Sequence, residues 1–203
     1  MKHQLFTMLQ LQDEMNIKVH PAWRQQEFQW SRAIWVECAE LMDHYGWKWW
    51  KKQAVDREQV ILELIDIWHF GLSALLQEES DKQKLIIELQ RALESPELES
   101  NFLESVEAFA QHALAYRKFH IARFAGLLIQ MEVDFNRLFQ SYVGKNVLNF
   151  FRQDRGYKDG SYQKVWQGRE DNVHLVEILE SLDLQSVTYR DDIYRALGER
   201  YPV

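Results

Sequence analysis

Apolar residues recur along most of this chain at the spacing of an α-helix, three or four residues apart. The spacing predicts a first helix from about Gln4 to Asn16, a second from about Phe28 to Tyr45 and a third from about Asp56 to Gln77. The centre of the third, VILELIDIWHFGLSALL, is apolar almost all round, which is typical of the buried central helix of a bundle. We therefore expect an all-α fold, built as an antiparallel helical bundle.

The helical pattern continues to the end of the chain, and no strand pattern is visible. We expect residues 1–203 to form a single all-α domain, in which a helical subdomain around residues 80–140 and a lid near residues 156–168 are mobile. The remaining elements expected are a polar helix up to Ser95-Pro96, two amphipathic helices between residues 97 and 140 with a joint near 118–120, a short helix at about 144–155, a glycine-containing loop at 156–168 and two small helices after it.

Composition narrows the class of protein. Only 3 Pro and 8 Gly occur in 203 residues, so turns are few and elements are long, while 46% hydrophobic residues are enough for a substantial core. The net charge of −7 argues against a protein that coats DNA or RNA, and we expect no nucleic-acid polymer as a partner. An acidic chain can still bind phosphates when metal ions bridge acid to phosphate.

The single cysteine and the N-terminal segment bear on the compartment. Cys38 lies on the apolar stripe of the second helix and excludes an intramolecular disulfide, which fits a reducing cytoplasm. The segment MKHQLFTMLQLQDEM has no long apolar core and so does not resemble a signal peptide. No run of 18 apolar residues occurs, so we expect no membrane span and a cytoplasmic location.

Two matched pairs of acids suggest a metal site. Glu37 and Glu40 lie three residues apart on the second helix, and Glu63 and Asp66 lie three apart on the third. At about 100° per residue each pair sits on one helix face, on the same flank of its apolar stripe. If the two helices pack antiparallel, all four carboxylates can converge on one point.

The third helix makes a metal site the more economical explanation. Between Gln59 and Leu76, Glu63 and Asp66 are the only acids, and the segment contains no Lys or Arg. Burying two carboxylates is costly without a positive charge nearby. Oxygen ligands suit Mg²⁺ or Mn²⁺ rather than Zn²⁺. The alternative is that these acids lie on a solvated edge, since acids three apart are common on helices.

A basic segment interrupts the acidic chain. Residues 145–169 contain six basic residues against two acids. Lys145, Asn149 and Arg152 share one helical face, and Tyr157 follows the glycine that ends this helix. Lysine and arginine both suit phosphate oxygens, so beside a carboxylate site this segment indicates triphosphate binding. Alone, it would be interpreted as a solvated basic face.

Aromatic and amide side chains are candidates for binding a base. Trp47, Trp49 and Trp50 crowd the connection after the second helix, where a tryptophan can stack on a ring or pack in the core. Gln12 and Asn16 present two amides on one face of the first helix, and an amide matches the edge of a pyrimidine. His44 and His69 lie near the acids and are either ligands or packed core residues.

Taken together, these residues resemble the dimeric all-α dUTPases, relatives of the MazG-like and dCTPase-type pyrophosphatases. The paired ExxE and ExxD acids are shared across that superfamily and indicate the chemistry, whereas the other motifs are more specific to the dimeric dUTPases. The resemblance runs through LQDEMN (11–16), ECAELMDHYGWKWWK (37–51), ELIDIWHF (63–70), YVGKNVLNFFRQDRGYKDGSY (142–162) and EDN (170–172).

The resemblance implies an all-α nucleoside triphosphate pyrophosphatase that hydrolyses dUTP to dUMP and pyrophosphate as a homodimer. Each site would use about two or three Mg²⁺ ions, with Mn²⁺ as a possible substitute. The implied roles are Glu37, Glu40, Glu63 and Asp66 for metal, with Glu37 also acting on the attacking water; Lys145, Arg152, Tyr157, Lys158 and Lys164 for phosphates; and Gln12, Asn16, Trp49 and Asn149 for base and sugar.

Three other functions remain open at this point. The nearest is the same chemistry on dCTP, on both dUTP and dCTP, or on a broader set of deoxynucleotides. A carboxylate di-iron bundle would need two ExxH pairs, and only Asp66-x-x-His69 approximates one. The third is a helical dimer without enzymatic activity.

Overall fold

A computed structural model describes residues 1–183, 186 and 188–202, and its described residues are predominantly helical. The expected all-α class is therefore confirmed. The elements are α1 (Lys2–Val19), the 3₁₀ helix η1 (Trp23–Gln25), α2 (Trp30–Tyr45), α3 (Arg57–Glu78), α4 (Lys82–Leu93), α5 (Phe102–Tyr116), α6 (Ile121–Gln130), α7 (Phe135–Asp154), β1 (Val165–Trp166), β2 (Arg169–Glu170), α8 (Asp171–Ser181) and α9 (Tyr189–Arg200).

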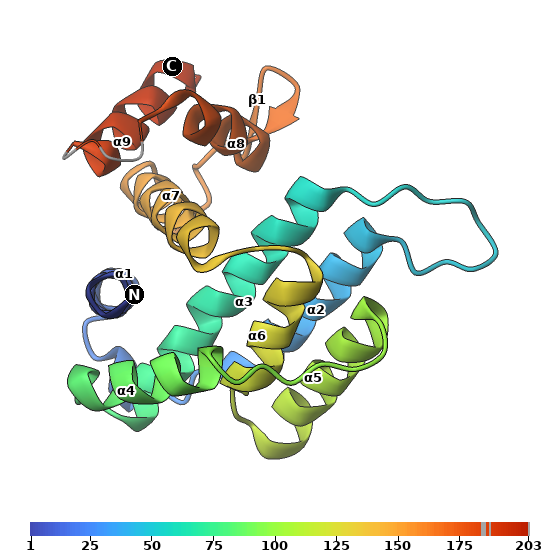
Figure 1. Ribbon diagram of the computed structural model, residues 1–203. Helices are drawn as coiled ribbons and strands as arrows, with labels where there is room; N and C mark the ends of the chain where they lie inside the picture. The colour runs from blue at the N-terminus through green and yellow to red at the C-terminus, as the bar shows by residue number, and fades with distance from the viewer. Residues whose placement is uncertain (184–185, 187, 203) are drawn as a thin grey trace. The chain divides into compact units, whose positions relative to one another are not determined.

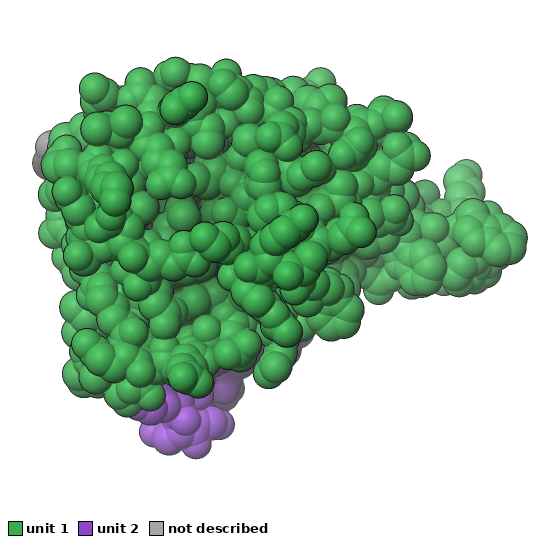
Figure 2. Space-filling view, turned by 90° about the horizontal axis from the view of Figure 1, so that it is seen from below, with its two compact units in different colours: residues 1–138 green, residues 139–203 purple. Residues whose placement is uncertain are grey.

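The chain divides into two compact units, residues 1–138 and residues 139–203, shown in different colours in Figure 2. The boundary falls inside α7, whose first residues belong to unit 1. Each unit has its own hydrophobic core and is described separately. The expected mobility of residues 80–140 and of a lid at 156–168 remains a prediction.

In unit 1, α2 and α3 form an antiparallel helical hairpin. The indole of Trp30, at the start of α2, donates a hydrogen bond to Gln77 near the end of α3. At the opposite end, the backbone N–H of Asp56 donates to the carbonyl of His44 at 3.0 Å. α1, α4, α5 and α6 surround this hairpin (Figure 1). The antiparallel packing that the paired acids require is therefore present.

α3 is the central helix of unit 1 because almost its whole circumference is apolar. Asp56 caps its N-terminus by accepting from the backbone N–H of Gln59 at 3.2 Å. By length and composition alone the helix could cross a membrane, but 78% of that window is buried. Trp68 is fully buried and stacks on Phe124 of α6, with ring centroids 5.1 Å apart. The apolar faces of α3 are thus covered by protein.

The helices between residues 97 and 140 also match the sequence pattern. α5 and α6 meet at a joint in residues 117–120, where a break was expected. Phe119 in this joint packs on the backbone of Gly71 in α3, where an added Cβ would lie 2.7 Å from the phenyl ring. A side chain at position 71 would therefore displace the α5–α6 connection from the central helix.

Unit 2 differs from the sequence expectation in two places. The expected short helix at 144–155 is the second half of a longer helix, α7, which continues through Gly144; Leu179 packs closely against that glycine and leaves no room for a side chain there. Residues 165–170 form a two-stranded antiparallel hairpin, although no strand was expected. A strand of two residues is too short to show an alternating pattern. The core of this unit contains Val147, Leu148, Phe151, Trp166, Leu175, Ile178, Ile193 and Leu197.

Candidate functional site: an acidic cluster and a basic cluster

Three of the four expected carboxylates converge on the α2–α3 hairpin. Ligand oxygens of Glu37, Glu63 and Asp66 all lie within 4.8 Å of one another. Glu37 projects from α2, and the other two project from successive turns of α3. The antiparallel packing of two helices with acids three residues apart produces this arrangement, as the sequence spacing predicted.

Glu40 lies outside this three-carboxylate group. It is exposed one turn further along α2, beside a surface hollow of about 430 Å³ that Trp35 and His44 also line. Its charge still contributes to raising the pKa of Glu37. The structure thus brings together three of the expected ligands and leaves the fourth at the edge of the cluster.

The acidic cluster strongly perturbs the ionisation of Glu37. Burial, followed by the charge of Asp66 and by the hydrogen bond and charge of Glu63, raises the pKa of Glu37 from 4.5 to about 9. Each of these effects penalises the ionised form of a carboxylate. A positive charge placed among the three groups would relieve the repulsion and restore the ionised form.

The two histidines near the cluster differ in their contacts. His44 Nε2 lies 3.6 Å from a carboxylate oxygen of Glu63, so this half-buried ring adjoins the acids. His69 is buried on α3, and its Nδ1 lies 2.7 Å from Oε1 of Gln12. Cys38 is buried beside Glu37, and burial raises the pKa of its thiol to about 12, so it is a packed, unreactive side chain.

The donor set of the cluster fits a hard divalent cation. Three carboxylates within reach of one another provide oxygen ligands, which Mg²⁺ and Mn²⁺ prefer. Burial, and after it the neighbouring carboxylates, raise the pKa of Glu37, and a cation among these groups would oppose both effects. Glu37, Glu63 and Asp66 therefore form a candidate metal centre.

The tryptophan-rich connection between α2 and α3 extends away from the helices as a long loop (Figure 1). Trp49 is 90% exposed, and its ring meets the ring of Trp50 edge to face with centroids 5.3 Å apart. Trp47 donates from its indole N–H to Asp43 at 2.9 Å. Of the three rings, Trp49 is thus the one presented most fully to a ligand.

The expected base-binding amides belong to a buried polar network between α1 and α3. The amino group of Gln12 donates to Oδ1 of Asn16 at 3.1 Å and to the hydroxyl of Ser73 at 2.9 Å. The amino group of Asn16 donates to the same hydroxyl at 3.0 Å. Gln12 and Asn16 are only 4% and 6% exposed, so little of either side chain is open to a ligand. Their role in base binding remains a prediction.

In unit 2 the central feature of the basic segment is an ion pair between Arg152 and Asp171. The guanidinium donates from Nε and Nη2 to the two carboxylate oxygens of Asp171, each at 2.8 Å. The hydroxyl of Tyr162 donates to the same carboxylate at 2.8 Å. Burial opposes ionisation of Asp171, but Arg152, Tyr162 and the charge of Lys145 outweigh it and lower the pKa of Asp171 below 3.8.

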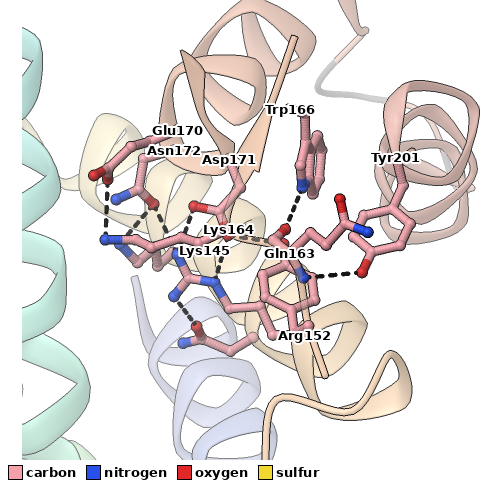
Figure 3. Close-up of polar contacts among 11 residues, drawn as sticks. Lys145, Arg152, Gln163, Lys164, Trp166, Glu170, Asp171, Asn172 and Tyr201 are labelled. Carbon is pink, nitrogen blue, oxygen red and sulfur yellow. Dashed lines mark hydrogen bonds and ion pairs between the residues drawn. The ribbon is translucent and has the colours of Figure 1, made fainter. Parts of the chain in front are cut away.

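Lys145 and Lys164 also have partners within unit 2 (Figure 3). Lys145 Nζ donates to Oδ1 of Asn172 at 3.0 Å. Lys164 Nζ lies 3.0 Å from a carboxylate oxygen of Glu170. These contacts fix the positions of two ammonium groups beside the Arg152 guanidinium.

The remaining expected phosphate and sugar contacts lie around Arg152. Asn149 accepts from Arg152 Nη1 at 3.2 Å. Tyr157 is half exposed, with the Arg152 guanidinium 5.8 Å from the centre of its ring. Lys158 is exposed on the turn that follows. The structure therefore gathers Asn149 and Tyr157 around the guanidinium of Arg152, and the phosphate-binding roles themselves remain predictions.

Sequence reasoning missed residues that organise the basic cluster and the amide network of α1. Asp171 and Asn172 orient Arg152 and Lys145, and the motif EDN that contains them does not by itself indicate this role. Ser73 joins the two amides of α1, and nothing in the apolar pattern of α3 marks it except that it is a polar residue among apolar ones. An isolated polar residue on a buried helix predicts a hydrogen-bond partner on a neighbouring element, because buried polar groups are nearly always hydrogen-bonded.

The fold and the acidic cluster define an all-α protein with a carboxylate centre suited to divalent cations. A family model described as dUTPase matches residues 4–157, which include the acidic cluster, the tryptophan-rich loop and α7. The chain therefore belongs to the dUTPase family, in its all-α type. Membership at this level supports a hydrolase that acts on a nucleotide and uses divalent metal. A comparison with curated proteins found no match.

Proposed function

We propose that this protein hydrolyses dUTP to dUMP and pyrophosphate with Mg²⁺, or with Mn²⁺ as a substitute. The observation on which the proposal depends is the convergence of Glu37, Glu63 and Asp66 in a chain that belongs to the dUTPase family. In this reaction a water oxygen bonds to the α-phosphorus, and the bond between that phosphorus and the oxygen bridging to the β-phosphate breaks. Pyrophosphate is the leaving group.

Glu37, Glu63 and Asp66 would hold the metal, with Glu40 as a further ligand at the edge of the cluster. When bound, about two or three such ions would supply charge neutralisation for the phosphates and lower the pKa of coordinated water. Glu37 would accept the proton of the attacking water on a carboxylate oxygen. Burial and the other carboxylates of the cluster raise the pKa of Glu37, and a raised pKa favours acceptance of a proton.

The cations of unit 2 would hold phosphate oxygens. We assign this role to Lys145, Arg152 and Tyr157, with Lys158 and Lys164 as weaker contributors. Two nitrogens of Arg152 already bind Asp171, which fixes the plane of the guanidinium. Phosphate would therefore contact an oriented guanidinium, which is the geometry that favours recognition of this ligand.

Trp49, Gln12 and Asn16 would bind the base, and Asn149 would contact the sugar or phosphate region. Trp49 offers an exposed ring for stacking. The di-iron alternative receives little support from the geometry, since His69 directs Nδ1 to Gln12 and the acidic cluster consists of carboxylates among the described residues. We also propose that the protein acts as a homodimer in the cytoplasm.

The deciding experiment is a pyrophosphate-release screen over the common ribo- and deoxynucleoside triphosphates, with Mg²⁺, with Mn²⁺ and with EDTA. We expect dUTP to be the preferred substrate and EDTA to abolish its hydrolysis. Preference for dCTP, or equal use of several nucleotides, would assign the same chemistry to another substrate. Absence of pyrophosphate release from every nucleotide would overturn the proposal.

Metal binding can be checked without activity by measuring Tm against Mg²⁺ concentration. An ion that binds only the folded protein raises stability by about 2.7 kcal/mol at a hundred times its Kd. We expect Mg²⁺ to raise the Tm of the wild type and to have much less effect on Asp66→Asn. Glu88→Gln, at an exposed position on α4, is the matched control and should respond as the wild type does.

A further inference from the structure

The hydroxyl of Ser73 lies at the junction of the two amides that α1 directs toward α3. Ser73 is fully buried, and its Oγ accepts from the amino groups of Gln12 and Asn16 at 2.9 and 3.0 Å. The hydroxyl also lies 3.0 Å from the backbone carbonyl oxygen of His69, one turn earlier on α3, and 3.3 Å from Oδ1 of Asn16, so the His69 carbonyl is the nearer acceptor for its hydrogen. One oxygen therefore receives both amide donors and has a backbone acceptor for its own hydrogen.

This arrangement fixes which end of each amide faces α3. The two ends of a primary amide have nearly the same shape, so only the direction of the hydrogen bonds distinguishes oxygen from nitrogen. A backbone carbonyl can only accept, so a Ser73 hydroxyl that donates to His69 directs its lone pairs toward α1. Both amino groups must then face Ser73.

The carbonyl oxygens of the amides are fixed by the same network. Oε1 of Gln12 lies 2.7 Å from Nδ1 of His69, and Oδ1 of Asn16 accepts from the amino group of Gln12 at 3.1 Å. Rotating either amide by 180° would place two donors or two acceptors opposite each other. Buried groups mismatched in this way cost about 1–3 kcal/mol each.

We propose that Ser73 is a specificity-determining positioning residue, which selects uracil over cytosine by locking the Gln12 and Asn16 amides in one orientation. This inference rests on the proposed function. Uracil presents a donor at N3 and an acceptor at O4, whereas cytosine presents an acceptor at N3 and a donor at N4. An amide that can rotate matches either base. An amide that is locked matches one base and leaves the other with unpaired groups.

The test compares kcat and KM for dUTP and dCTP in the wild type and in Ser73→Ala. Alanine removes the shared acceptor of both amino groups, and the contacts that remain, between the two amides and with His69, can also form when both amides rotate together. We expect the ratio of kcat/KM for dUTP to that for dCTP to fall at least about tenfold, mainly through a higher KM for dUTP. The kcat for dUTP should change less than about twofold, because Ser73 is not proposed to contact the phosphates.

Ser105→Ala is the matched control. Ser105 is also a buried serine of unit 1, and its hydroxyl accepts from the backbone N–H of Glu99 at 2.8 Å. Both variants lose one buried hydroxyl, so both should lower Tm, but Ser105→Ala should leave the dUTP to dCTP ratio at its wild-type value. If Ser73→Ala does not fold, Ser73→Cys has a similar volume and only a weak acceptor, and it should shift the ratio in the same direction.

The outcomes separate the two proposals. A wild type that hydrolyses dUTP, with an unchanged nucleotide ratio in the Ser73 variant, overturns the role of Ser73 alone. A uniform loss of activity on both nucleotides shows a purely structural role for Ser73 and also overturns the inference. A wild type that releases no pyrophosphate from either nucleotide overturns the proposed function, and the role of Ser73 falls with it.

Discussion

The acidic cluster of unit 1 and the basic cluster of unit 2 differ in whether their charges are balanced by opposite charges. On the α2–α3 hairpin, like charges stand within 4.8 Å of one another, and burial with this repulsion raises the pKa of Glu37 to about 9. In unit 2 the Arg152 guanidinium pairs with Asp171 through two hydrogen bonds, and the pKa of Asp171 is lowered despite its burial.

The difference indicates what each region needs from a ligand. The carboxyl groups of the acidic cluster oppose one another's ionisation, so a cation bound among them would lower the free energy of the folded protein. The basic cluster is stabilised by its own partners, so the phosphate that we propose as its ligand would meet cations that are already positioned. Pre-positioned cations lose less conformational freedom when a ligand binds, which is how such a network favours binding.

The largest expected effect comes from breaking the Arg152–Asp171 pair. Asp171 is fully buried and the Arg152 side chain is 12% exposed, so Asp171→Asn leaves a buried guanidinium without its counterion. We expect a loss of about 3–5 kcal/mol in the free energy of unfolding, measured by urea denaturation. A loss below about 1 kcal/mol would show that the pair does not hold unit 2 together.

The pH dependence of stability provides a second test of this pair. Because the pKa of Asp171 is lower in the folded chain, its contribution is fully present above its ordinary pKa of 3.8 and is lost as pH falls through the folded value. We expect the wild type to lose stability on acidification below about pH 4 and Asp171→Asn to lose less over the same range. Equal slopes for the two proteins would contradict this assignment.

The next effect concerns activity rather than stability. Glu37→Gln should lower turnover at least about a hundredfold, the scale for removing a catalytic base or a metal ligand. In EDTA its Tm should be equal to or higher than that of the wild type, because the amide has no ionisable group whose burial beside Glu63 and Asp66 opposes folding. Near-normal turnover would remove Glu37 from the site, and a large fall in Tm would mean that burying this carboxyl group does not oppose folding.

A smaller effect tests whether unit 1 also selects the base. Trp49→Ala should raise KM for dUTP by an amount equivalent to about 1–3 kcal/mol, the scale for one base stacked on an aromatic ring. The rise should be larger for dUTP than for other triphosphates, while Tm stays nearly constant because the ring is 90% exposed. A uniform KM change across nucleotides would exclude Trp49 from base selection.

The smallest effect serves as a reference for the basic cluster. Lys164 and Glu170 also form an ion pair at 3.0 Å, but both side chains are about half exposed. Glu170→Gln should therefore cost less than about 1 kcal/mol in the free energy of unfolding. A cost as large as that of Asp171→Asn would mean that exposure does not distinguish the two pairs.

The sequence by itself determined the helical class, most of the helix order and the acidic cluster. Apolar spacing identifies α1 to α6 because a helix repeats every 3.6 residues, and pairs of acids three residues apart must share a helix face. The antiparallel packing of α2 and α3 then brings Glu37 to Glu63 and Asp66.

Only the tertiary structure decided which side chains that lie far apart in the sequence contact one another. Leu179 of α8 packs against Gly144 of α7, and the pairing of Arg152 with Asp171 joins residues nineteen positions apart. Ser73 meets Gln12 across 61 positions. No local period encodes such contacts, because they arise from the packing of one element against another.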